Sequence, residues 1–140
     1  MSLKTIKVIF LLTAIFNFVL GAGLGLFFRE INEWSDLQLP NHPAYMQLPS
    51  LFVFVFGIGM LFVVYDPLGN RSIMLLGVLM KTSYAVVILG NSFFHTMPLL
   101  HVAVAGCDLV HALLFLAAYL ATRPQVLKRA SAEAGCAVGY

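Results

Sequence analysis

Four apolar stretches, each close to the length of a membrane-spanning helix, take up most of this 140-residue chain. A helix needs about 20 apolar residues to cross about 30 Å of hydrocarbon. Hydrophobic residues make up 61% of the sequence and charged residues only 10%, which leaves too little polar surface for a water-soluble globule. We therefore predict an all-α integral membrane protein.

The predicted organisation is one transmembrane domain over residues 1–122, followed by a cytoplasmic tail at 123–140. The expected spans are residues 6–28, 49–65, 72–90 and 99–122, and an outer surface loop covers 29–48. Because the connections are short, consecutive helices are expected to pack as antiparallel neighbours in a four-helix bundle.

The second span is the shortest of the four. Leu51 to Tyr65 would rise only about 23 Å as a helix, which is less than the hydrocarbon thickness. Three solutions are open: the helix extends back through Met46 to Ser50, the bilayer thins locally, or the span stays buried against its neighbours.

Basic residues are shared unevenly between the ends of the predicted spans. Lys4 and Lys7 lie at the start of the first span, Arg71 lies between the second and the third, and Arg123 follows the fourth. Cytoplasmic loops carry the excess of Lys and Arg, so both termini are expected in the cytoplasm, and the expected location is the bacterial inner membrane. The net charge of +2 is scattered rather than gathered in a basic patch, which argues against a nucleic-acid partner.

Ionisable residues lie in the middle of the third and fourth spans, where they are most costly. Lys81 and Asp108 are each about nine residues, or about 14 Å, from an end of their span, so both are expected near the bilayer midplane. In antiparallel neighbours Lys81 falls at a level between Asp108 and His111. An ion pair is the first expectation.

The fourth span also carries a polar stripe. His101 and Asp108 are within about 20° of each other around the helix, and His111 is about 60° further round. The third span offers Tyr84 as a hydrogen-bonding partner near Lys81. We predict a ligand-binding site formed by Lys81, Asp108, His111, Tyr84 and His101.

Small residues are spaced for close contact between helices. Gly21 and Gly25 form a Gly-x-x-x-Gly step, which lets backbones touch within the bundle or between protomers. The predicted helix-packing positions are Asn17, Gly21, Gly25, Gly57 and Gly77.

No metal site and no cofactor are predicted. Asp108 and His111 are three residues apart and could share one ion, but one helix supplies two ligands at most. A haem would most readily use His95 and His101.

Two functions fit these observations. In the first, the protein binds, and perhaps moves, a small polar or amphipathic ligand at the Lys81/Asp108/His111 site. In the alternative, Lys81 and Asp108 are an assembly clasp in a non-enzymatic accessory subunit of a larger membrane complex, associated with haem or quinone. Expected partners are the lipid bilayer and either further copies of the chain or other membrane subunits. No nucleophile with its base is visible beyond Asp108 and His111, so an enzyme is not favoured.

Overall fold

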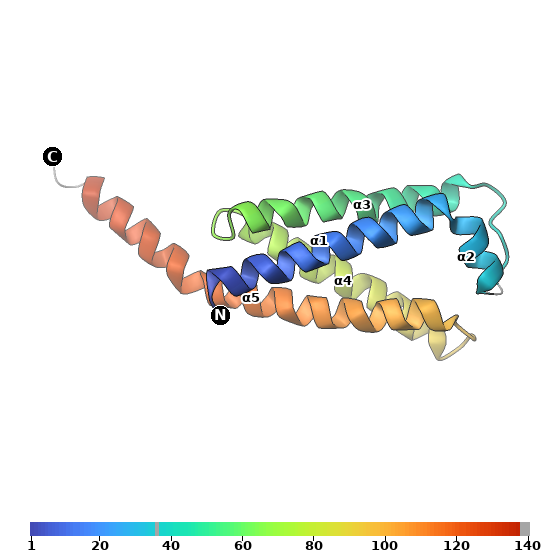
Figure 1. The fold of residues 1–140 in the computed structure, drawn as a ribbon. Coiled ribbons are helices and arrows are strands. Elements are labelled where there is room, and N and C mark those ends of the chain that lie inside the picture. Colours follow the sequence, from blue (N-terminus) through green and yellow to red (C-terminus); the bar gives the residue numbers. More distant parts are fainter. Residues whose placement is uncertain (36, 138–140) are drawn as a thin grey trace.

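The computed structural model describes residues 1–35 and 37–137, with side chains at all of these except 128–130 and 132–137. Its described residues form helices and no strands (Figure 1). The five helices are α1 (Leu3–Leu26), α2 (Phe28–Trp34), α3 (Ala44–Tyr65), α4 (Arg71–Ser92) and α5 (Leu99–Ala137). Residue 36 of the predicted loop and residues 138–140 of the predicted tail lie outside the described residues.

Four of these helices are long and apolar enough to cross a membrane, which confirms the predicted all-α class with four apolar helices. A helix is suited to this role because it satisfies its backbone hydrogen bonds internally, where lipid offers none. In Figure 1, α1 and α4 run in one direction, and α3 and α5 run back.

The second long helix extends further than its apolar core. α3 begins at Ala44, so it includes Met46 to Ser50, and its 22 residues span about 33 Å. Pro49 lies inside this helix and has no N–H to donate to the carbonyl of Tyr45. Tyr45 is 69% exposed at the helix start, where water or headgroups can satisfy that carbonyl.

The last helix does not end at Thr122 as expected. α5 continues through Pro124 to Ala137, and Figure 1 shows it changing direction in its last third. Pro124 removes the hydrogen bond to the carbonyl four residues earlier, which is a common cause of a kink. The apolar part that could span a membrane reaches Leu127.

The segment between α1 and α3 contains the short helix α2. It lies at an angle to α1 beyond the end of the long helices (Figure 1). Phe28 and Asn32 are buried, whereas Trp34 is 79% exposed. This is the pattern expected of a helix that lies at a membrane surface.

The long helices pack as two pairs, α1 with α3 and α4 with α5, and contacts between the pairs are fewer. Gly21 explains the closeness of α1 and α3. A Cβ at Gly21 would lie 2.7 Å from the backbone nitrogen of Phe54 and 2.8 Å from the carbonyl oxygen of Ser50, so only glycine fits.

The pairs meet in a hydrophobic cluster near the chain's N-terminus and separate toward the end that carries α2 (Figure 1). We call the first region the shared-core end; its buried members are Ile6, Phe10, Ala14, Met60, Val63, Met74, Phe115 and Ala118. Phe10 and Phe115 stack across the pairs, with ring centroids 4.3 Å apart. We call the region beyond Asn17, toward α2, the cavity end.

Candidate functional site

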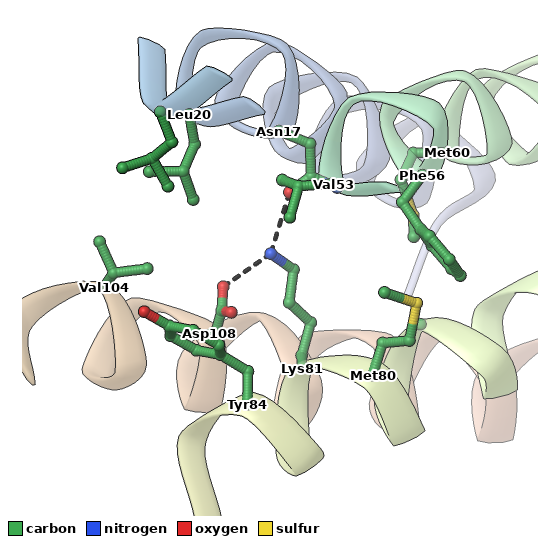
Figure 2. A pocket seen from close by; sticks show the side chains of 12 residues that line it. Asn17, Leu20, Val53, Phe56, Met60, Met80, Lys81, Tyr84, Val104 and Asp108 are labelled. Atoms are coloured by element: carbon green, nitrogen blue, oxygen red, sulfur yellow. Dashed lines mark hydrogen bonds and ion pairs between the residues drawn. The ribbon is translucent and has the colours of Figure 1, made fainter. Parts of the chain in front are cut away.

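A buried polar network joins the two helix pairs where the shared-core end gives way to the cavity end. Lys81 on α4 reaches between Asn17 on α1 and Asp108 on α5 (Figure 2). Its Nζ is 2.6 Å from Asp108 Oδ1 and 2.9 Å from Asn17 Oδ1. The ion pair expected from the sequence therefore forms, and Asn17 extends it to the other pair.

All members of this network are removed from solvent. Relative exposure is 7% for Lys81, 5% for Asp108 and 2% for Asn17. The ammonium also lies 5.2 Å from the centroid of the Phe16 ring, close enough for a cation–π contact. A charge in such a place is tolerated when an opposite charge and further hydrogen bonds compensate for lost hydration, and Lys81 has both.

A cavity of about 140 Å³ adjoins the network. Its polar lining residues are Asn17, Lys81, Tyr84 and Asp108. The rest of the lining is apolar or glycine and comes from all four long helices: Leu20, Leu24, Val53, Phe56, Met60, Gly77, Met80 and Val104. Figure 2 shows Asn17, Lys81 and Asp108 crossing the middle of this lining, with Leu20 and Val104 on one side and Phe56, Met60 and Met80 on the other.

The polar lining keeps hydrogen-bonding capacity to spare. The ammonium has three donors, of which two are used on Asn17 and Asp108. Among the described residues, no hydrogen bond involves the Asn17 amide NH₂, the Tyr84 hydroxyl or Asp108 Oδ2. Lys81, Asn17 and Tyr84 can therefore each donate a hydrogen bond at the cavity wall, and Tyr84 and Asp108 Oδ2 can each accept one.

The two predicted histidines lie outside this cavity. His111 Nδ1 is 4.0 Å from Asp108 Oδ1, too far for a hydrogen bond, and its ring lies 5.3 Å from that of Phe16. Neither His111 nor His101 lines the cavity, and Nδ1 of each is buried without a hydrogen-bond partner in the described part of the chain. The structure thus lines one cavity with Lys81, Asp108 and Tyr84, and it places His111 next to Asp108 but outside this cavity.

The predicted packing glycines serve different contacts. A Cβ at Gly57 would lie 2.6 Å from the Phe18 ring, and one at Gly25 would lie 3.4 Å from the Ser50 Cβ. Gly77 forms part of the cavity wall, and a Cβ there would lie 2.8 Å from the Phe115 ring. These contacts are all made within one chain.

Among the side chains that the structure describes, no group of three or more His, Cys, Asp or Glu is placed to hold a metal ion. His95 is exposed on the connection between α4 and α5.

Sequence reasoning placed Asn17 among packing residues and did not foresee its bond to Lys81. The sequence did contain a sign of this bond, because Asn17 is the one side-chain amide within the first span and lies near its middle. The apolar cavity wall had no such signal, since Leu20, Val53 and Val104 look like ordinary lipid-facing residues in sequence.

Comparison of the chain with protein families, curated protein sequences and solved structures finds no match.

Proposed function

We propose that this protein binds a small, uncharged amphipathic molecule in the cavity beside the Lys81–Asp108 pair. The observation that carries the proposal is the cavity itself, which is apolar except where Asn17, Lys81, Tyr84 and Asp108 face it. Ligand sites have this character: mostly apolar walls with a few polar groups that fix orientation.

The charge of the site selects an uncharged ligand. Lys81 and Asp108 neutralise each other at 2.6 Å, so a charged group entering beside them would lose its hydration without gaining a free counter-ion. A carbonyl or hydroxyl oxygen fits better, because Lys81, Asn17 and Tyr84 can each donate a hydrogen bond. We further propose that His111, with Nδ1 4.0 Å from Asp108 Oδ1, influences the charge of Asp108 from outside the cavity.

The volume limits the part of the ligand that enters. An apolar cavity of about 150 Å³ is large enough for benzene. The volume of about 140 Å³ here therefore suits one ring or a short alkyl segment next to the oxygen. Any longer apolar tail would lie between the pairs or in lipid.

The experiment is a comparison of thermal unfolding in nanodiscs with 1-decanol, decanoate or decylammonium added. A ligand that binds only the folded state raises its stability. Decanol is expected to raise the Tm of the wild type, and the two ions are expected not to do so.

Two variants separate site binding from a general effect on the bilayer. Val104→Phe fills the cavity and should abolish the decanol shift, whereas Val110→Phe, which is 57% exposed on the same helix and not part of the lining, should keep it. Equal shifts in both variants would refute the proposed site.

We also propose that the chain forms an antiparallel bundle in the inner membrane of a bacterium, with both termini in the cytoplasm. Lys4, Lys7, Arg71 and Arg123 support this orientation. Transport of the ligand is a further step, testable by flux into proteoliposomes.

The second candidate is an accessory subunit, associated with haem or quinone, or a homo-oligomer. Its support is that a Cβ at Gly23, Gly90 or Gly106 would meet nothing within 4 Å, so other helices could approach these backbones closely. This function predicts that Lys81→Met/Asp108→Leu leaves complex formation unchanged, as judged by copurification. The ligand-binding function predicts that the same folded variant no longer responds to decanol.

A further inference from the structure

A second polar feature lies at the opposite end of the bundle from α2, where α4 begins. Arg71, the first residue of α4, crosses to α5. Its Nε donates to Thr122 Oγ1 at 3.0 Å, and its Nη2 donates to the carbonyl oxygen of Tyr119 at 2.9 Å. The guanidinium carbon also lies 4.3 Å from the centroid of the Tyr119 ring. Arg71 is thus held in a fixed orientation.

Neither of the two groups that accept hydrogen bonds from the guanidinium is an anion. A hydroxyl, a carbonyl and an aromatic ring are its contacts, and Nη1 has no hydrogen bond in the described part of the chain. Arginine has five N–H donors in a planar fork, of which two are used here. The unused edge matches the geometry of a phosphate.

An apolar groove continues from this cation along α4. The groove has a volume of about 320 Å³ and is lined by Arg71, Ser72, Leu75, Leu76, Leu79 and Tyr119. The exposed fractions of the three leucines are 40%, 48% and 58%. Arg71 and Leu79 are about 12 Å apart along the helix axis. The groove therefore has a polar group, the Arg71 guanidinium, at the end of the span and an apolar wall that runs from there toward the middle of the span.

We propose that this groove binds one glycerophospholipid from the adjacent leaflet. The lipid phosphate accepts hydrogen bonds from Arg71, and an acyl chain lies along Leu75, Leu76 and Leu79. Because one cation and no acid line the groove, an anionic headgroup such as phosphatidylglycerol is preferred over phosphatidylcholine, whose choline cation would have no partner. This site is independent of the cavity beside Lys81.

The test is native mass spectrometry of protein released from nanodiscs of equal phosphatidylglycerol and phosphatidylcholine. We expect the wild type to retain one phosphatidylglycerol that Arg71→Gln loses. Arg29→Gln is the matched control, because Arg29 also lies at a helix end, 5.8 Å from the Phe28 ring, but lines neither the groove nor the ligand cavity. Equal loss in both variants would overturn the proposal.

A second pair of variants keeps the charge and changes the groove. Leu76→Trp should displace the acyl chain and lose the bound lipid, whereas Leu113→Trp, which is 68% exposed on α5 outside the groove, should retain it. Retention of the lipid by Leu76→Trp would contradict a lipid site. Release of the lipid by millimolar inorganic phosphate would also contradict it, because it would indicate a site for phosphate alone.

Discussion

The two ends of the bundle are held together in different ways. At the shared-core end the helix pairs meet through apolar side chains, with Phe10 and Phe115 stacked at the centre. At the start of the cavity end, the pairs are joined by Asn17, Lys81 and Asp108. The hydrogen bonds of Lys81 thus join the two pairs at the level where apolar packing between them ends.

The comparison shows why the network and the cavity occur together. Lipid tails are as apolar as leucine, so apolar contact between helices adds packing but no hydrophobic drive. Where the pairs diverge, packing is incomplete and a cavity of about 140 Å³ remains. The network is part of the lining of that cavity and gives it hydrogen-bonding groups.

Breaking the ion pair should have the largest effect. Lys81→Met leaves Asp108 buried without its counter-ion, and loss of one partner of a buried pair costs about 3–5 kcal/mol. The double variant Lys81→Met/Asp108→Leu should recover to within about 1 kcal/mol of wild type, because no unpaired charge remains. Reversible unfolding by SDS in mixed micelles measures both, and a single variant as stable as the double would contradict this account.

Removing the central ring of the shared-core end should cost about 2–3 kcal/mol. Phe115→Ala leaves a void where Phe10 and Gly77 now contact the ring, although lipid removes the usual transfer term. Phe62→Ala on α3 is the control, since Phe62 is 55% exposed and should change stability little. The same unfolding assay applies, and equal losses would show that the shared core is not what joins the pairs.

Crowding one helix pair tests whether packing within a pair differs from packing between pairs. Gly21→Ala puts a methyl group within 2.8 Å of α3 backbone atoms, and such overpacking costs about 1–3 kcal/mol. Gly23→Ala meets nothing within 4 Å and should be neutral or slightly stabilising. The difference between the two Tm values is the measurement.

The smallest expected change comes from the polar link to α1. Asn17→Leu removes one hydrogen bond to Lys81, and such bonds in membranes average about 0.6 kcal/mol. Thr13→Val is the control, because the Thr13 hydroxyl bonds only within α1, to the carbonyl of Ile9 at 2.9 Å. An Asn17→Leu loss as small as that of Thr13→Val would mean that the network does not join the pairs.

The class of fold was predictable because the signal is strong and local. An apolar stretch of about 20 residues satisfies its backbone hydrogen bonds in lipid by forming a helix, and all four stretches appear as long helices. Helix ends were less predictable. Proline usually ends a helix, yet Pro49 and Pro124 both lie inside helices. Neighbouring groups or solvent can satisfy the carbonyls that lose a hydrogen bond to these prolines.

The candidate site was partly predictable for a related reason. Charged residues are so rare in apolar spans that Lys81 and Asp108 stand out, and their depth alone led to the expected pair. The arrangement of the helices as two diverging pairs depends on tertiary contacts such as the stack of Phe10 on Phe115, which periodicity does not encode. For this reason the cavity and the position of His111 outside it were not foreseen.

The most direct test of the central claim is photochemical labelling with a diazirine analogue of decanol, followed by peptide mapping. We predict labels at cavity-lining positions such as Leu20, Val53 and Val104, which unlabelled decanol competes away and Val104→Phe prevents. Labels confined to outward-facing positions such as Val19 and Val110, unchanged by competitor or variant, would contradict a ligand site beside Lys81 and Asp108.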